Sequence, residues 1–202
     1  MITNDTQLRY FFVYKPYGML CQFSPEKDKT TLAHLSFEFP KDAYPVGRLD
    51  EDSEGLLLIT NDKALNAKLL NPIFKHDRTY LVQVDGNISQ AATMALQKGV
   101  IIKPKDKPYL TLPAKAEIID EPTDIQARKP PIRFRANIPT SWLKLTLKEG
   151  KNRQVRKMTA KVGYPTLRLI RYSIEDICLL AFQPGRVWEL SKNEVYTLLK
   201  LH

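Results

Sequence analysis

Short apolar runs, rich in β-branched and aromatic residues, recur along the chain and predict strands. They are YFFVY (10–14), LLLIT (56–60), TYLVQV (79–84), IRFRANI (132–138), WLKLTL (142–147), LRLIRY (167–172) and ICLLAF (177–182). Polar and apolar residues alternate in IRFRANI and WLKLTL, which is typical of an antiparallel sheet with one exposed face. The Pro-rich residues 121–134 predict a surface excursion between sheet elements.

Cap residues predict helices between the strands. Asn61–Asp62 can cap a helix that runs to Leu70, where Asn71–Pro72 ends it. Ser89 can cap a second helix, and Gly99 closes it. These elements predict an α+β fold in which helices flank a mixed, mostly antiparallel sheet.

The sequence NRQVRKMTAKVG (152–163) predicts a third helix, with Asn152 as its N-cap and Gly163 just past its end. Its apolar positions recur at helical spacing and predict a buried stripe, made of Val155, Met158, Thr159 and Val162. Arg156 falls about 100° from the centre of that stripe. We therefore expect Arg156 at the rim of the helix, where it can pair with a partly buried carboxylate.

The chain is strongly basic. Its 202 residues include 31 Lys and Arg against 22 Asp and Glu, which gives a formal charge of +9 at pH 7. Seven of the basic residues lie between positions 151 and 172, where there is no acid: Lys151, Arg153, Arg156, Lys157, Lys161, Arg168 and Arg171. An excess of this kind favours a polyanionic partner, most often a nucleic acid, over a merely solvated surface.

Cysteine usage argues against a disulfide framework and against a zinc site. Only Cys21 and Cys178 are present, without a CxxC pair, and the three histidines are scattered. The amino terminus lacks the pattern of a secretory signal, and no segment approaches 18 consecutive apolar residues. We expect a cytoplasmic protein with no membrane partner and no metal.

An acidic cluster interrupts the basic chain in GRLDEDSEGL (47–56), where four acids occupy five positions from Asp50 to Glu54. The simplest interpretation is a polar turn before the core strand LLLIT. A calcium loop is a poor alternative, because its twelfth position falls on Asn61 where a bidentate Glu is needed. Asp50 could instead work with Asp52 or Glu54 as the two carboxylates of a hydrolase.

A further interpretation gives one acid a catalytic role. Arg48 directly precedes Leu49–Asp50, and Leu49 can turn inward while its neighbours face a cleft. An arginine close by favours the ionised form of an aspartate, and an ionised aspartate can act as a nucleophile. The remaining acids, Glu51, Asp52 and Glu54, would then be only turn and cap residues.

Four motifs in order carry a resemblance to a known family. VGRLDEDSEGLLLITND (46–62) resembles the GRLDxx[ST]xGLLLLTxD signature of pseudouridine synthases of the small-subunit rRNA pseudouridine synthase A (RsuA) family. FVYKPYGMLC (12–21), RTYLVQVDG (78–86) and EGKNRQVRKM (149–158) are similar to the other family motifs, and GRVWELSKNEVYTLL (185–199) is similar to the family's carboxyl-terminal segment. The resemblance extends from about Leu8 to Leu199.

The resemblance implies a role for each matching residue. Asp50 would be the catalytic aspartate and Arg156 the arginine paired with it. Tyr80 would stack on the target base, and Val155 would give the uracil an apolar contact. Without the resemblance, Tyr80 would be an ordinary aromatic of a strand.

Lys15 and Arg48 would support the cleft or bind a phosphate, although Lys15 could also be only a strand end before a turn. The RNA backbone would lie on the basic residues of the cleft. We expect them to be Lys15, Lys151, Arg153, Lys157, Lys161, Arg168 and Arg171.

The implied fold is the pseudouridine synthase catalytic fold with a central RNA-binding cleft. We expect a short tail at residues 1–7 and a catalytic domain at residues 8–202, without the small domain like ribosomal protein S4 that precedes many family members. This pattern resembles the short large-subunit rRNA pseudouridine synthase E type. Converting uridine to pseudouridine changes no redox state, so we expect no cofactor.

The implied partner is ribosomal RNA, with a stem-loop of 23S rRNA near the peptidyl-transferase region as the expected substrate for a monomeric enzyme. A basic RNA-binding or ribosome assembly factor without catalysis remains the alternative. The sequence leaves open which uridine is modified. It also leaves open whether Asp50 attacks uracil C6 or ribose C1′, or abstracts a 2′ proton.

Overall fold

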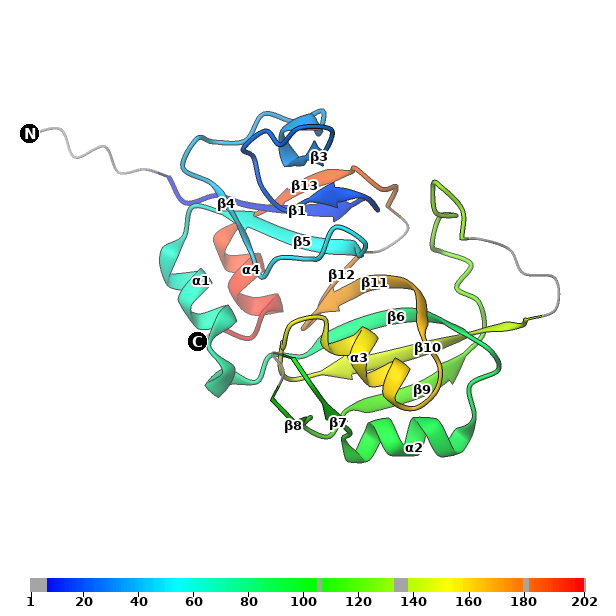
Figure 1. Cartoon of the computed structure of the whole chain (residues 1–202). Helices are drawn as coiled ribbons and strands as arrows, with labels where there is room; N and C mark the ends of the chain where they lie inside the picture. Colours follow the sequence, from blue (N-terminus) through cyan, green and yellow to red (C-terminus); the bar gives the residue numbers. More distant parts are fainter. Residues whose placement is uncertain (1–6, 105–106, 133–137, 180–181, 202) are drawn as a thin grey trace, which may run out of the picture.

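The computed structural model of the chain describes residues 7–104, 107–132, 138–179 and 182–201. One large mixed sheet has the strand order β13-β1-β5-β11-β6-β10-β9, with β4 paired to β5 and β12 to β11. Its strands are β1 (Tyr10–Lys15), β4 (Tyr44–Val46), β5 (Glu54–Thr60), β6 (Arg78–Asp85), β9 (Lys115–Ile119), β10 (Thr140–Leu147), β11 (Thr166–Ile174), β12 (Ile177–Cys178) and β13 (Val187–Leu190). Figure 1 shows the sheet running through the molecule from β13 to β9.

The helices lie on both sides of this sheet (Figure 1). They are α1 (Lys63–Leu70), α2 (Gln90–Lys98), α3 (Gln154–Lys161) and α4 (Lys192–Leu198), with 3-10 turns η1 (Leu32–His34) and η2 (Pro72–Phe74). Two small strand pairs complete the described part: β2 (Met19–Leu20) with β3 (Thr30–Thr31), and β7 (Ile101–Ile102) with β8 (Tyr109–Leu110). No helix within the described ranges is long and apolar enough to cross a membrane.

The sheet has a seam where β5 meets β11. This pairing is parallel and joins only Ile170 to Glu54 and Arg171 to Gly55, whereas every other pairing within the sheet is antiparallel. Gly55 has a φ of +114°, and a Cβ at this position would lie 2.4 Å from the carbonyl oxygen of Arg171. Only glycine allows the two backbones to approach so closely.

Alternating side chains of the strands enter separate cores. Phe12 and Leu58 pack on one face of β1 and β5 with α1 and α4, while Phe11 and Leu57 pack on the opposite face. A third core lies between β6, β10, α2 and α3. The strands at the centre of the sheet are therefore covered on both faces. A charged residue on one of these strands is buried and needs a partner within the protein.

Most predicted elements are confirmed. Asp62 caps α1 through hydrogen bonds from Ala64 N and Leu65 N, and Ser89 caps α2. Two predictions were inexact: ICLLAF forms only the two-residue β12 before residues 180–181, and α3 begins at Gln154 with Arg153, not Asn152, as its N-cap. Arg153 has a left-handed backbone conformation with a φ of +50°. The helix therefore begins one residue later than it would with Asn152 as its N-cap.

Other predictions concern residues outside the described part. Most of the predicted strand IRFRANI, residues 133–137, lies outside the described residues. So do residues 1–6 of the predicted tail. The described part of the Pro-rich excursion contacts both sides of the sheet seam. Its Arg128 lies 4.2 Å over the ring of Tyr17, and its Gln126 accepts a hydrogen bond from Arg168.

Candidate active site

A cleft of about 620 Å³ opens beside the seam. Its walls come from the loop before β5, the segment from α1 to β6, and the segment from β10 to α3. Seven of the lining residues are cationic: Arg48, Lys75, Arg78, Lys148, Lys151, Arg153 and Arg171. Asp50 and Glu149 are the acids among the lining residues, so the cleft is suited to an anionic ligand that meets a single accessible carboxylate.

Asp50 lies in the tight turn that leads into β5. Ser53 N donates to the carbonyl oxygen of Asp50 at 3.1 Å, and the preceding Leu49 is buried with its N–H on the sulfur of Cys21. The inward turn of Leu49 agrees with the sequence prediction. It leaves the Asp50 side chain at the cleft with 38% of its surface exposed, so a substrate can reach the carboxylate.

Arg153 is the arginine that pairs with Asp50. Its Nη1 lies 3.5 Å from Asp50 Oδ2, and its Nη1 and Nη2 donate to Asp52 at 3.0 and 2.7 Å. The described residues show no ion pair between Asp50 and Arg156 within 4.0 Å, but the charge of Asp50 still acts on Arg156, so their predicted pairing stays a prediction. Because α3 begins after Arg153, this side chain leaves the start of the helix toward the 50–52 turn.

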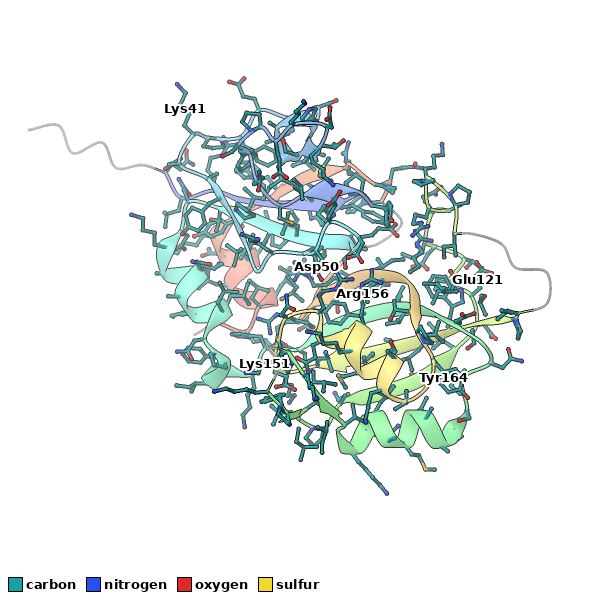
Figure 2. All side chains as sticks on the ribbon, in the orientation of Figure 1. Lys41, Asp50, Glu121, Lys151, Arg156 and Tyr164 are labelled. Atoms are coloured by element: carbon teal, nitrogen blue, oxygen red, sulfur yellow. The ribbon has the colours of Figure 1, made fainter. Side chains whose placement is uncertain are left out.

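Arg156 holds the backbone and side chain of Asp52 instead. Its Nη2 donates to the Asp52 carbonyl oxygen at 2.6 Å, and its Nε lies 3.4 Å from Asp52 Oδ2. Figure 2 shows Asp50 and Arg156 near each other, beside the seam between β5 and β11. In agreement, the charge of Asp50 acts to raise the pKa of Arg156. Burial lowers the pKa of Arg156, while the charge of Asp52 opposes that effect.

Asp52 is more than a turn residue. Partial burial opposes its ionisation, but the hydrogen bonds from Arg153 and the charge of Arg156 outweigh burial and hold its pKa below the usual value. Glu54 also has another role, because it is only 2% exposed and accepts two 2.8 Å hydrogen bonds from Arg168. Both carboxylates are engaged by arginine, which argues against either as the second carboxylate of a hydrolase.

Three predicted RNA-binding residues are buried. Lys15 is 0% exposed, and its ammonium donates to the carbonyl oxygens of Pro16, Met19 and Glu51, at 2.8, 2.7 and 3.4 Å. Burial lowers its pKa to about 8. Lys15 therefore neutralises a carbonyl-rich turn and cannot hold an RNA phosphate.

Arg168 and Arg171 are buried on the central strand β11. Arg168 pairs with Glu54, and Arg171 donates to the carbonyl oxygens of Leu56 and Gly47 at 2.7 and 2.8 Å. Both guanidinium groups are buried and bonded within the protein, so the structure gives this part of the predicted footprint no support. Arg171 still lines the floor of the cleft and ties the loop before Asp50 to the seam.

The other predicted cations lie on different surfaces. Lys151 and Arg153 are exposed and line the cleft, and Lys151 lies 4.7 Å from the centre of the Tyr109 ring. Lys157 does not line the cleft, and its ammonium donates to the carbonyl oxygen of Pro104 and to Asn152, which does line it. Lys161 lines a separate apolar groove between α2 and α3. The basic segment therefore supplies two exposed residues, Lys151 and Arg153, and the buried Arg171 to the cleft, not a continuous footprint.

Tyr80, Val155 and Arg48 line the same cleft as Asp50. Tyr80 is half-buried on β6, and Val155 is buried on α3 beside Leu147 and Leu169. These side chains form an apolar wall that could receive the flat face of a base. Arg48 is exposed at the mouth of the cleft, and the described residues offer it no ion-pair partner.

A buried network that sequence reasoning missed supports the start of α3. Glu149 accepts hydrogen bonds from Gln154 Nε2 at 2.7 Å, from Leu112 N at 2.8 Å and from the hydroxyl of Tyr109. Gln154 Oε1 in turn accepts from Lys151 N at 2.9 Å. Glu149 and Gln154 are fixed positions of the EGxxRQ motif, and that motif was the signal that could have identified them.

The arrangement combines an accessible carboxylate, a neighbouring arginine and an apolar wall. The arginine lies beside the carboxylate, and the wall can orient a planar ring next to it. No cluster of three metal-binding side chains is found among the residues that the structure describes. The accessible carboxylate beside the apolar wall is suited to nucleophilic or basic chemistry on a planar ring.

Comparisons with known proteins agree with this geometry. The family model described as RNA pseudouridylate synthase matches residues 9–161. Ribosomal large subunit pseudouridine synthase E of Vibrio parahaemolyticus is 51% identical over 187 residues, which cover 92% of this chain and 76% of the relative. The protein of the same name from Xanthomonas axonopodis pv. citri is 47% identical over 170 residues, covering 84% of this chain and 87% of the relative.

More distant relatives extend the likeness. Ribosomal large subunit pseudouridine synthase B of Bacillus subtilis is 32% identical over 192 residues, covering 95% of this chain and 72% of the relative. A solved structure titled as a pseudouridylate synthase superposes with a TM-score of 0.76 at 27% identity, covering 95% of this chain and 74% of that chain.

Proposed function

The chain belongs to the RNA pseudouridylate synthase family, and from this premise we propose that it converts a uridine of large-subunit ribosomal RNA to pseudouridine with Asp50 as the catalytic carboxylate. One observation carries the assignment of the residue. The aspartate of the GRLD motif is the accessible carboxylate in a cleft that is otherwise lined by cations and an apolar wall. This surrounding matches a uracil base attached to a polyanionic backbone.

The reaction is an isomerisation. The bond between uracil N1 and ribose C1′ breaks, the uracil turns, and a bond forms between C5 and C1′. The proton of C5 leaves to solvent and N1 takes up a proton, so no atom is gained or lost overall. Asp50 can serve by attack on uracil C6, by attack on ribose C1′ or by removal of a 2′ proton. Each route needs the carboxylate to face the substrate, and the guanidinium of Arg153 lies 3.5 Å from it.

The target base must leave its stack before it reaches Asp50. Unstacking costs a few kcal/mol, which an apolar pocket with an aromatic side chain offsets. We assign this role to Tyr80, with Val155 as a second apolar contact. Arg48, at the mouth of the cleft and next to the motif, is suited to a phosphate beside the flipped nucleotide.

The RNA backbone would follow the cations that are accessible at the cleft. Lys75, Lys148, Lys151 and Arg153 lie on its walls, and together they replace the longer basic segment expected from sequence. RNA that is folded into a stem-loop is recognised through phosphates and splayed bases, as this mixture of charged and apolar surface requires. We infer a stem-loop of 23S rRNA as the substrate, bound by a monomer in the cytoplasm.

Tritium release from RNA labelled at uracil C5 tests the activity. The wild-type protein should release tritium from 23S rRNA, whereas Asp50→Asn should release none and still bind the RNA. Release by Asp50→Asn at the wild-type rate would refute the assignment of Asp50. Binding without any release by the wild-type protein would instead support a non-catalytic RNA-binding factor.

A further inference from the structure

An exposed apolar turn lies beside the candidate active site. It connects α1 to β6 and contains η2 (Figure 1). Leu70 is 46% exposed, Ile73 77% and Phe74 53%, so three large apolar side chains within five positions face solvent. Single exposed apolar residues are common on proteins, but a cluster of this size more often marks a binding surface.

The turn is held in a defined shape. Asn71 Oδ1 accepts from Ile73 N at 3.0 Å, and Asn71 O accepts from Phe74 N at 3.2 Å. Pro72 fixes the first position of η2, and Lys75 ends it with a φ of +50°. The apolar pair is therefore presented outward by a tight, hydrogen-bonded turn.

Both ends of the turn are anchored in the protein. Arg78 donates to the carbonyl oxygen of Leu69 at 2.8 Å and to that of His76 at 3.2 Å. His76 is buried, and its Nδ1 lies 3.1 Å from Glu175, which also accepts from Asp77 N at 2.9 Å. These contacts come from β6 and from the turn between β11 and β12, so the turn is fixed relative to the sheet.

The turn is continuous with the cleft that contains Asp50. Leu70, Asn71, Pro72, Lys75 and His76 all line that cleft. Ile73 and Phe74, which lie between these lining residues in sequence, occupy the outer side of the same lip. A strand of RNA whose target uridine enters the cleft can therefore reach this lip.

The charge around the lip selects the class of ligand. Lys75 lies next to Phe74 in sequence, and Arg48, Arg78 and Lys148 line the same cleft. Apolar and aromatic side chains interleaved with cations are typical of surfaces that bind unpaired nucleotides, because the cations meet phosphates and the rings stack on bases. An apolar protein partner would not need this ring of cations.

We propose that Phe74, supported by Ile73, stacks on an unpaired base next to the target uridine and so helps to select the stem-loop. This inference rests on the proposed function, because it takes the cleft to be the site that receives the uridine. It assigns Phe74 to positioning and not to the chemical step. Loss of the ring should therefore weaken binding of the RNA more than it slows the reaction of bound RNA.

The test compares Phe74→Ala, Phe74→Trp and Met94→Ala in the full chain. Met94 is 47% exposed on α2 and lies outside the cleft, so Met94→Ala is a matched control for the loss of an exposed apolar side chain. The substrate is a C5-tritiated stem-loop transcript of 23S rRNA. Phe74→Ala should raise KM and Kd about tenfold with little change in kcat, Phe74→Trp should restore both, and Met94→Ala should leave both unchanged.

A fluorescent probe separates stacking from a general effect on folding. The probe is 2-aminopurine, placed in the RNA beside the target position. Binding of the wild-type protein should change the fluorescence of 2-aminopurine, and Phe74→Ala should remove most of that change. The Phe74→Ala protein should keep the wild-type Tm. Equal KM and equal emission for Phe74→Ala and wild type would overturn the proposal. Absence of tritium release by the wild type would refute the proposed function, whereas the emission change would still report stacking at Phe74.

Discussion

The guanidinium of Arg153 lies 3.5 Å from the carboxylate of Asp50 and makes two shorter hydrogen bonds to Asp52. Asp52 thereby fixes the arginine that faces the catalytic candidate, and Arg156 fixes Asp52 through its backbone and side chain. The two acids have separate tasks. Asp50 is left accessible for chemistry, while Asp52 positions the cation that lies beside it.

Replacement of Asp52 by Asn should reduce activity without abolishing it. The amide keeps the size of the side chain but loses the charge that holds Arg153, and a small misplacement of an active-site group can lower a rate about 100-fold. We expect kcat for tritium release to fall by about tenfold or more. Glu51→Gln is the matched control, because Glu51 pairs with Lys29 at the surface. Equal rates for the two variants would contradict a positioning role for Asp52.

Breaking the buried pair of Glu54 and Arg168 should be strongly destabilising. Arg168→Met leaves the Glu54 carboxylate buried without its partner, which costs roughly 3–5 kcal/mol of unfolding free energy. The double variant Glu54→Met with Arg168→Met should recover much of that loss. Removal of the exposed pair of Arg9 and Glu189 should cost less than about 1 kcal/mol. Urea unfolding measures all three, and equal losses would show that burial of the ion pair is unimportant.

Gly55→Ala should disrupt the seam between β5 and β11. The new methyl group would lie 2.4 Å from the carbonyl oxygen of Arg171, so the strands must separate. Gly185→Ala is the control, because Gly185 also has a positive φ but has no heavy atom within 4 Å of the added Cβ. We expect a much lower Tm for Gly55→Ala than for Gly185→Ala. Similar Tm values would indicate that only backbone strain matters at Gly55.

Lys15 should make folding stability rise with pH. Its pKa is lowered from 10.5 to about 8 by burial, so between these values the unfolded chain binds more protons than the folded chain. Stability therefore increases as pH rises through this window. Relative to Lys15→Met, the wild type should gain about 2 kcal/mol in unfolding free energy from about pH 7 to pH 9.5.

Guanidinium unfolding at a series of pH values measures this difference. Lys41→Met, at an exposed position, provides the matched control and should reproduce the wild-type dependence. If the unfolding free energies of wild type and Lys15→Met differed by the same amount at every pH from about 7 to 9.5, the folded chain would keep the Lys15 proton.

Local features of the sequence determined the elements and the family. Apolar runs predict β1, β5, β6, β10 and β11, because a strand in a covered sheet needs apolar side chains on both faces. Asp62 and Ser89 predict the starts of α1 and α2, because a cap bonds to backbone groups only two or three residues away. The GRLD motif likewise singled out Asp50 before any geometry was known.

The tertiary structure decided which charges meet. Arg153 lies just before α3 with a left-handed backbone, and its guanidinium contacts both Asp50 and Asp52, while Arg156 contacts Asp52 from the helix itself. The burial of Lys15, Arg168 and Arg171 was equally hidden, since a sequence gives the number of cations but not what covers each of them. Exposure and pairing depend on contacts between segments that are distant in sequence, and only the folded sheet brings those segments together.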